Sequence, residues 1–323
     1  MSRTCHLSRT RHLSRIATAF LLGGALVLGG CSAEDAFDLR GEQPVPKRLV
    51  RMMKARDMAV DAPVLMRIFK EESTLEVWKQ KADGRYALLK KYDICKYSGR
   101  LGPKLKEGDR QAPEGFYHVD RGLMNPRSSY FLSFNLGYPN RFDRAHARTG
   151  KHLMVHGACS SAGCYAMEDD QIAEIYAMAR DALGGGQRRF QVQALPFRMT
   201  PENMARHRDN PNFGFWENLK VGYDHFELTR TPPAVEVCDR SYRFNEKPLA
   251  GSFVANAPCP STTTPERLAK LYASYQSDYR LRFDKAVRKL GGEPPAPTVE
   301  AAGNAAVADV SVPEGVTVEP LAE

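Results

Sequence analysis

The chain has 323 residues, of which 42% are hydrophobic and 26% are charged, and its formal net charge is +8 at pH 7. The first thirty residues contribute +4 and residues 293–323 contribute −6, so residues 31–292 carry +10. No internal repeat is visible, which excludes a solenoid. The central part, about 260 residues, suffices for one large domain or for a domain with an extension.

Residues 1–30 have the features of a signal peptide. They contain four arginines, no acidic residue and an apolar run from Ile16 to Gly30, which is too short to span a bilayer comfortably. The run ends in Leu-Gly-Gly-Cys31, which resembles a bacterial lipoprotein signal, in which the cysteine is diacylated and becomes the mature N-terminus. Ordinary secretory cleavage, with Cys31 incidental, is the alternative.

A lipidated Cys31 predicts a periplasmic protein anchored to a membrane. Ser32, rather than an acidic residue, follows the cysteine, which by the sorting rule for such lipoproteins favours the inner leaflet of the outer membrane. In that compartment a basic body favours anionic polymers such as cell-wall glycans, or lipid headgroups, as partners. Nucleic acid is not expected as a partner.

After a linker or helix at residues 31–61, short alternating runs predict strands. These runs cover 64–69, 74–80, 86–95, 130–134 and 152–157. Residues 98–120 are rich in Gly, Pro and charged residues, and they predict a long loop between strands. A loop of this length inside a compact domain is usually functional or mobile.

The pattern becomes helical in the second half of the chain. Residues 168–183 begin with three acidic residues and carry apolar residues at helical spacing, so they predict a helix. A strand is expected at 188–197, and helices at 200–207, around 215–226 and at 264–291. The predicted fold class is α+β, with a mainly β domain at 62–200 and a mainly helical extension at 201–292. Residues 293–323 predict a disordered acidic tail.

The cysteines outside the leader are odd in number once Cys31 is set aside. An oxidising compartment permits disulfides, and Cys238 and Cys259 flank a turn-rich segment that could be closed by one. Such a pairing would leave Cys95, Cys159 and Cys164, so at least one of these three must be a free thiol or have another role.

Four interpretations of Cys164 are open from the residues alone. It could bind zinc with His152, His156 and Cys159, form a disulfide with Cys159, be a buried inert thiol, or be a nucleophile. Zinc is disfavoured, because structural zinc sites usually present ligand pairs on chelating turns, whereas His152 and His156 lie in a predicted strand. No metal is therefore expected.

The neighbourhood of Cys164 favours a nucleophile. Residues 160–163 are small and leave the thiol little cover, and the turn they form leaves the N–H groups of Gly163 and Cys164 available for an oxyanion. The N-terminus of the helix that follows should favour the thiolate, with His156 as its partner.

Several segments together resemble the YkuD-type L,D-transpeptidases, most closely their YafK (DpaA) branch. These segments are "VHG" followed by "SAGC", the upstream "GDRQAPEGFYHV", and "FNLGYPNRFD" just before the histidine strand. The resemblance is strong over Pro63–Thr200 and weak into "FWENLKVGYDHFE". It implies a β-sandwich or barrel with a helix after the nucleophile, and no cofactor.

The resemblance also implies roles for individual residues. Cys164 would be the nucleophile acylated by a peptidoglycan stem peptide, His156 the general base and acid, and Gly163 an oxyanion donor. Substrate-binding roles are expected for Tyr138, Gly157 and Ser161. The chain departs from the family pattern where Ala162 replaces a second histidine, where Ala166 replaces an arginine or asparagine, and in its shorter spacing from base to thiol.

These departures leave the acyl acceptor open. The first prediction is a cysteine acyl-transferase that forms a thioester with the stem peptide at its diamino acid. The alternatives are a hydrolase or amidase that releases protein or peptide from peptidoglycan, and a non-catalytic wall-binding lipoprotein with Cys164 locked to Cys159. The expected partners are peptidoglycan stem peptides, an envelope protein linked to peptidoglycan, and a membrane through the lipid anchor.

Overall fold

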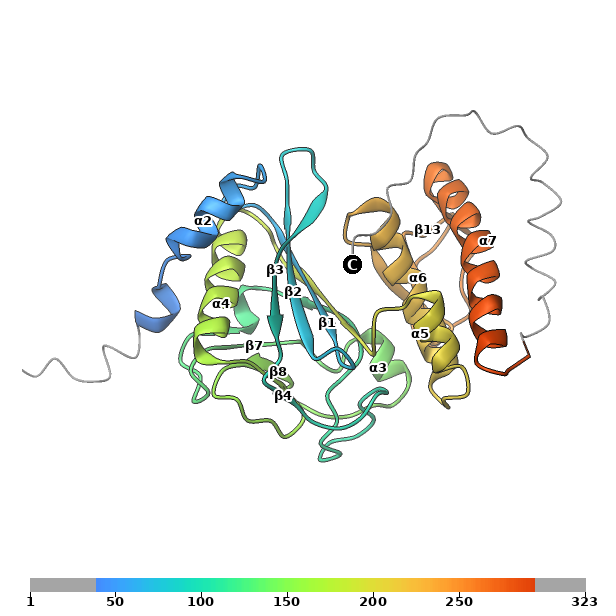
Figure 1. Ribbon diagram of the computed structural model, residues 1–323, viewed down its shortest axis with the longest axis horizontal. Coiled ribbons are helices and arrows are strands. Elements are labelled where there is room, and N and C mark those ends of the chain that lie inside the picture. The colour runs from blue at the N-terminus through green and yellow to red at the C-terminus, as the bar shows by residue number, and fades with distance from the viewer. Residues whose placement is uncertain (1–38, 294–323) are drawn as a thin grey trace, which may run out of the picture.

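The computed structural model describes residues 39–293 and shows an α+β architecture of two five-stranded sheets with helices around them (Figure 1). The fold class predicted from the sequence is confirmed, and neither sheet closes into a barrel within this range. The predicted signal peptide, the lipidation site Cys31 and all but the first residue of the predicted tail lie outside the described residues.

The first sheet has the strand order β3-β2-β1-β10-β5, and its bounds largely follow the sequence prediction. The strands are β1 Val64–Phe69, β2 Thr74–Gln80, β3 Tyr86–Asp93, β5 Gly115–Val119 and β10 Phe190–Leu195. β1 and β10 are parallel central neighbours and are buried along their whole length, which explains their high apolar content. Only β5 was wrongly assigned, to the end of the loop predicted at 98–120.

The second sheet is made of very short strands in the order β4-β9-β8-β7-β6. They are β4 Lys96–Tyr97, β6 Met124–Asn125, β7 Ser133–Asn135, β8 Met154–His156 and β9 Tyr165–Ala166, with the 3-10 helix η2 Arg121–Leu123 before β6. β8 and β9 are parallel, with Val155 opposite Tyr165 and His156 opposite Ala166. This pairing brings the two halves of the "VHG…SAGC" motif together.

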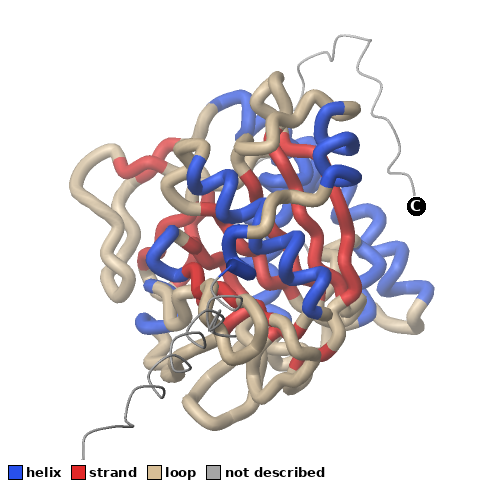
Figure 2. Tube along the Cα trace, turned by 90° about the vertical axis from the view of Figure 1, so that its left-hand side faces the viewer, coloured by secondary structure: helices blue, strands red, loops and turns tan. Residues whose placement is uncertain are grey.

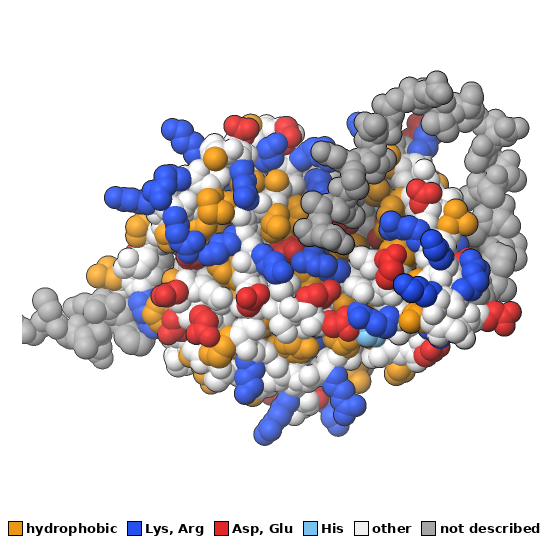
Figure 3. All heavy atoms as spheres, viewed as in Figure 1, with side chains coloured by type: hydrophobic (Ala, Val, Ile, Leu, Met, Phe, Trp, Pro, Cys, Tyr) orange, Lys and Arg blue, Asp and Glu red, His pale blue; other side chains and the backbone are white. Residues whose placement is uncertain are grey.

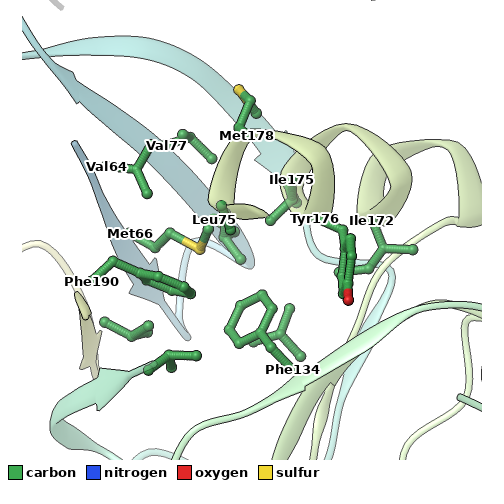
Figure 4. Close-up of a cluster of buried hydrophobic side chains, with 14 of the residues drawn as sticks. Val64, Met66, Leu75, Val77, Phe134, Ile172, Ile175, Tyr176, Met178 and Phe190 are labelled. Carbon is green, nitrogen blue, oxygen red and sulfur yellow. The ribbon is translucent and has the colours of Figure 1, made fainter. Parts of the chain in front are cut away.

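The main core lies where the two sheets meet the helix α4 Asp169–Gly184. Glu168 and Gln171 form a capping box at its start, which fixes the beginning of the helix at the predicted place. Side chains of α4 point toward both sheets in Figure 4, namely Ile172, Ile175, Tyr176 and Met178 against Val64, Met66, Leu75, Val77, Phe134 and Phe190. The 3-10 helix η1 Leu39–Glu42 and the helix α2 Lys47–Lys54 lie on the same side (Figure 1).

The C-terminal part packs against the other side of the first sheet (Figure 1). It contains α5 Pro201–Arg206, α6 Phe213–Thr229, the hairpin β11 Val235–Cys238 with β12 Ser241–Phe244, the pair β13 Lys247–Pro248 and β14 Thr262–Thr263, and α7 Glu266–Lys289. Its core includes Phe69 and Phe116 from the first sheet, so the extension shares a hydrophobic core with the β domain. Figure 2 shows the strands in the interior with helices outside them.

Candidate active site

The parallel pairing of β8 with β9 places His156 and Cys164 on one face of the second sheet. His156 is opposite Ala166, and Cys164 lies two residues before Ala166, so the alternation of side chains along a strand puts both on the same side. Val155 and Tyr165, which alternate with them, are completely buried in the main core.

His156 is held in the state that a general base requires. Its Nδ1 lies 2.6 Å from the carbonyl oxygen of Gly157, so Nδ1–H donates to that oxygen and Nε2 is left as the acceptor. The ring lies 4.8 Å from the ring of Tyr130, measured between centroids. Burial lowers the pKa of His156, although the bond to Gly157 partly opposes this effect. The imidazole is therefore neutral at neutral pH and can accept a proton.

Cys164 is the free cysteine among residues 39–293. Its thiol is half-buried and lies 3.5 Å from the carbonyl oxygen of His152. Burial raises the pKa of the thiol, while a backbone hydrogen bond from Met154 and the charge of Lys104 act in the opposite direction. The resting state is the thiol, so the thiolate expected from the following helix is not favoured in this structure.

The N-terminus of α4 interacts with acidic side chains of its own. Glu168 caps the helix, and Asp169 Oδ1 accepts a hydrogen bond of 2.7 Å from the backbone N–H of Ala158. Because these carboxylates already neutralise the positive end of the helix dipole, little of that field remains for the thiol. Formation of a thiolate at Cys164 would therefore require a base, and His156 on the neighbouring strand is the imidazole with a free acceptor nitrogen.

A disulfide joins Cys95 to Cys159, and another joins Cys238 to Cys259, a pair that the sequence offered only as one possible closure. The first bond shows that the pairing of Cys159 with Cys164 is wrong, and with it the locked, non-catalytic arrangement of Cys164. It also removes Cys159 as a thiolate ligand for zinc. Cys95 and Cys159 do lie close to Glu168, but their sulfur atoms are bonded to each other.

The segment before Cys164 has an uncommon backbone. Ala158 and Cys159 have φ angles of 62° and 42°, in the left-handed region that non-glycine residues rarely adopt. Such conformations persist only where the surrounding structure enforces them, and they cluster at functional sites. Here the disulfide and the hydrogen bond from Ala158 to Asp169 enforce them.

Ser161 organises the turn that carries Cys164. Its Oγ accepts hydrogen bonds from the N–H groups of Gly163 (3.3 Å) and Cys164 (3.1 Å) and donates to the Cys164 carbonyl oxygen (2.7 Å). Ser98 reaches across from the adjacent loop and contacts both Oγ and the carbonyl oxygen of Ser161. The two predicted oxyanion donors are thus occupied in this state, and they become available to an oxyanion only if the Ser161 hydroxyl turns away.

Gly157 and Tyr138, both predicted to bind substrate, have structural contacts that explain their identity. A Cβ atom on Gly157 would lie 2.5 Å from Asp169 Oδ1 and 3.0 Å from the carbonyl oxygen of Tyr130, so a side chain does not fit there. Tyr138 is buried, and its hydroxyl donates a hydrogen bond of 3.1 Å to the carbonyl oxygen of Lys104. Substrate contacts for these two residues stay predictions.

The loop that precedes β5 forms one wall of the site and is fixed rather than loose. Asp109 accepts hydrogen bonds from the N–H groups of Leu105 (2.9 Å), Lys106 (3.0 Å) and Gln111 (3.0 Å), and it forms an ion pair with Lys104. The sequence pointed to this loop through its Gly-Asp and Pro-x-Gly pattern. It did not identify Lys104 as a neighbour of the thiol.

A buried ion pair anchors the other end of this loop. The ammonium of Lys70 lies 3.0 Å from Glu114 Oε1, and neither side chain is exposed. Glu114 also accepts hydrogen bonds from the N–H of Gly102 and from the indole of Trp216 in α6. The wall of the site is thereby tied both to the first sheet and to the helical extension.

The arrangement can be compared with known proteins. "Putative L,D-transpeptidase YafK" of Escherichia coli strain K12 is 46% identical over 211 residues, which are 65% of this chain and 85% of the relative. The protein of the same name from Escherichia coli O157:H7 matches equally well. No established family profile matches the chain.

Solved structures resemble the chain only distantly. The helical cell shape determining protein Pgp2 from Campylobacter jejuni has a TM-score of 0.34 and 18% identity, over 59% of this chain and 79% of that one. Bd1075 from Bdellovibrio bacteriovorus has a TM-score of 0.30 and 17% identity, over 54% of this chain and 76% of that one. The extent and identity of the match to the two Escherichia coli proteins show that the chain belongs to the L,D-transpeptidase family, in its YafK branch.

Proposed function

We propose that the protein is a peptidoglycan-acting cysteine acyl-transferase of the L,D-transpeptidase type. The observation that carries the proposal is the pairing of β8 with β9, which presents a neutral imidazole and a free thiol on one face of the sheet. The 46% identity to the YafK proteins of Escherichia coli supports the same reaction class.

The first half-reaction consumes the thiol. His156 Nε2 takes the proton of Cys164, and the sulfur attacks the carbonyl carbon at the L-centre of the diamino acid in the stem peptide. The carbonyl oxygen becomes an oxyanion, which the N–H groups of Gly163 and Cys164 stabilise after Ser161 turns away, by about 3 kcal/mol for each well-placed donor. Collapse of this intermediate breaks the amide bond, the leaving amine takes the proton from His156, and a thioester remains.

The second half-reaction regenerates the enzyme. His156 removes a proton from an incoming amine or from water, which attacks the thioester and releases the sulfur as the Cys164 thiol. An amine acceptor yields a cross-linked product, whereas water yields a free carboxylate. The same thioester serves transpeptidation and the release of protein or peptide from peptidoglycan, so the acceptor decides between the two activities.

The decisive experiment is incubation with purified muropeptides followed by mass analysis of the products. We expect Cys164→Ala to abolish product formation without loss of thermal stability, and His156→Ala to be nearly as damaging. Ser160→Ala changes an exposed residue of the same turn and is the matched control, with activity near that of the wild type. Wild-type turnover by Cys164→Ala would end the proposal. The mass of the product distinguishes an amine acceptor from water.

A carbapenem provides an independent test of the nucleophile. Its strained lactam carbonyl should be attacked by the Cys164 sulfur, which adds the mass of the drug to the protein. Peptide mapping should place the adduct on Cys164, and the adduct should form more slowly in His156→Ala. The absence of an adduct on a demonstrably free Cys164 would contradict the proposed site.

We propose also that the mature chain begins at a lipidated Cys31 and resides in the periplasm, at the inner leaflet of the outer membrane. Within residues 39–293 no helix has the length and apolar character needed to cross a membrane. Lys and Arg side chains are spread over the face seen in Figure 3, interspersed with acidic ones, which suits contact with an anionic wall polymer. Intact mass of membrane-extracted protein should exceed that of the chain from Cys31 by its acyl groups. A chain without added lipid would refute the anchor.

A further inference from the structure

Tyr130 is an exposed aromatic residue that lies against the buried imidazole of His156. The centroids of the two rings are 4.8 Å apart, and the ring planes meet at 46°. Tyr130 is 46% exposed, whereas His156 is 3% exposed. Tyrosine usually buries most of its ring and keeps only its hydroxyl in contact with water. The tyrosine ring therefore covers part of the histidine at the expense of its own burial.

The backbone of Tyr130 is tied to His156 through Gly157. The N–H of Tyr130 donates a hydrogen bond of 3.1 Å to Oγ of the buried Ser128, and its carbonyl oxygen accepts one of 3.0 Å from the N–H of Gly157. The carbonyl oxygen of Gly157 in turn lies 2.6 Å from Nδ1 of His156. Gly157 therefore holds the backbone of Tyr130 with its N–H and the imidazole of His156 with its carbonyl group.

A left-handed residue sets the position of Tyr130. Phe131 has a φ angle of 68°, which is a strained conformation for a bulky residue. In an extended strand the carbonyl groups of residues two apart are separated by about 7 Å, so one N–H cannot reach both. Here the N–H of Gly157 lies 3.0 Å from the carbonyl oxygen of Tyr130 and 3.2 Å from that of Leu132. The turn at Phe131 thus brings Tyr130 back toward the strand that carries His156.

The strands on either side of His156 do not hold its ring. Ser133 on β7 is directly opposite His156 in the antiparallel pairing with β8, so the two side chains share one face. The hydroxyl of Ser133 is buried and has no hydrogen-bond partner among residues 39–293. On β9 the residue opposite His156 is Ala166, which carries no polar group. The imidazole is therefore held by its bond to Gly157 and by the ring of Tyr130.

A single hydrogen bond does not fix an imidazole. Rotation about the Cβ–Cγ bond of histidine has a broad, roughly two-fold preference, and a half-turn would place a carbon where Nδ1 now bonds Gly157. Proton transfer in both half-reactions needs Nε2 at one defined place beside Cys164. We propose that Tyr130 is a positioning residue, whose ring keeps the imidazole of His156 oriented with Nδ1 on the Gly157 carbonyl oxygen and Nε2 free for the thiol. The inference rests on the proposed function, in which His156 is the base.

The titratable groups around His156 come from three elements besides its own strand. They are Tyr130 before β7, Cys164 before β9, and Asp169 at the start of α4, whose Oδ1 accepts the N–H of Ala158. Burial is the main cause that lowers the pKa of His156, while the bond to Gly157 acts in the opposite direction. Removal of the Tyr130 ring would expose the imidazole, so the pKa of His156 should then rise toward 6.5.

The test combines steady-state turnover of muropeptides with nitrogen NMR of the isotope-labelled protein, in which His156→Gln assigns the signals of the imidazole. In Tyr130→Ala we expect kcat to fall at least about tenfold while KM stays within about twofold, because the ring orients the base and does not bind the substrate. The wild type should show His156 as a single tautomer with its proton on Nδ1, and Tyr130→Ala should show a mixture. The acid midpoint of kcat should rise toward pH 6.5 in the same variant.

Four further variants complete the test. Tyr130→Phe keeps the ring without its hydroxyl and should behave as the wild type. Ser129→Ala changes the exposed neighbouring residue and is the matched control, and Ser133→Ala removes the unpartnered hydroxyl; neither should change kcat or the tautomer. Tyr130→Leu keeps apolar volume without a planar face and should lose kcat and the single tautomer, even if the alanine variant does not fold.

Three results would overturn the inference. The first is wild-type kcat with a single tautomer in a folded Tyr130→Ala or Tyr130→Leu. The second is a rise in KM alone, which would make the ring a substrate contact. The third is loss of the single tautomer in Ser133→Ala instead, which would transfer the positioning role to Ser133.

Failure of this inference is distinguishable from failure of the proposed function. The NMR measurement needs no peptidoglycan substrate, so it reports on the imidazole alone. If the wild type turns over muropeptides and Tyr130→Ala matches it in turnover and tautomer, Tyr130 is rejected and the function stands. If the wild type shows no turnover but Tyr130→Ala loses the single tautomer, Tyr130 does hold the imidazole and the function is rejected.

Discussion

The two disulfides should stabilise the protein to a similar extent, but only the Cys95–Cys159 disulfide should matter for activity. The perturbation is the double variant Cys95→Ala/Cys159→Ala, which leaves no unpaired thiol behind. The control is Cys238→Ala/Cys259→Ala, which removes the disulfide of the C-terminal part. The first disulfide adjoins the left-handed residue pair before the nucleophile turn, whereas the second does not.

The loop lengths give the expected loss of stability. Cys95 and Cys159 are 64 residues apart, and the chain-entropy model gives about 4 kcal/mol for closing a loop of that size. Cys238 and Cys259 are 21 residues apart, for which the same model gives about 3 kcal/mol. For a chain of this size such losses lower the melting temperature by about 10 °C in either variant.

Activity should separate the two variants. Without its disulfide, the segment 158–163 loses the constraint that holds its strained backbone, and the turn that carries Cys164 is no longer fixed relative to His156. We expect at least a tenfold loss of muropeptide turnover, because displacement by about 1 Å costs up to a hundredfold in rate. The control should keep near-wild-type turnover.

The assay is turnover at a temperature at which circular dichroism shows both variants folded, together with thermal unfolding. Equal activity of the two double variants would refute the reasoning that the first disulfide positions the nucleophile turn. Loss of activity in the control alone would reverse the assignment.

Four further predictions follow from buried groups and close approaches. When muropeptide turnover is plotted against pH, its acid limb should have a midpoint below pH 6.5, because burial lowers the pKa of His156 and only the neutral imidazole is a base. When the alkylation rate of Cys164 is plotted against pH, its midpoint should lie above pH 9.0, because burial raises the pKa of the thiol. An acid midpoint above 6.5 measured by pH-dependent turnover would contradict this. Glu114→Gln should lower the free energy of unfolding, measured in urea, by about 3 kcal/mol, since it leaves the buried Lys70 ammonium without its counter-charge. A loss under 1 kcal/mol would show that the ion pair is unimportant for stability. Gly157→Ala should lower turnover at least tenfold, because the added Cβ would lie 2.5 Å from Asp169 Oδ1. The control Gly214→Ala, in a helix with open space around it, should leave turnover unchanged and leave the stability of the protein unchanged or raised. Equal turnover of the two variants would argue against the close approach at Gly157.

Most regular elements were predictable because their signals are local. The strand limits 64–69 and 74–80 were predicted at the observed residues, and the helix after the nucleophile starts within one residue of its predicted start. Alternation, capping residues and glycine stops act over a few residues, so they are legible in the sequence. β5 was missed because the Gly, Pro and charged residues before it dominate the composition of that stretch. The β11–β12 hairpin was missed because its strands are only four residues long.

Cys164 shows which part of the candidate site could be predicted from the sequence and which part could not. Local sequence made a nucleophile the favoured reading and named His156 as its base, and the register of β8 and β9 agrees with that pair. The same reasoning expected a thiolate near a helix N-terminus, whereas burial raises the pKa of the thiol and the helix end is neutralised by Glu168 and Asp169. The spacing of residues in the sequence does not show how far a thiol is buried from solvent, and burial is the largest influence on the pKa of this thiol.

The sequence by itself determined the fold class, the motif with its histidine and cysteine, and the family, because these depend on residue types and on spacings within a few turns or strands. Tertiary structure decided which cysteine partners Cys159. The antiparallel pairing of β4 with β9 sets Lys96 opposite Ala166, so Cys95 lies beside Met167, whose carbonyl oxygen accepts the N–H of Cys159. The Cys95–Cys159 bond joins residues 64 positions apart. Such a contact arises only when sheet register and loop packing are complete, since no local preference of the chain encodes it.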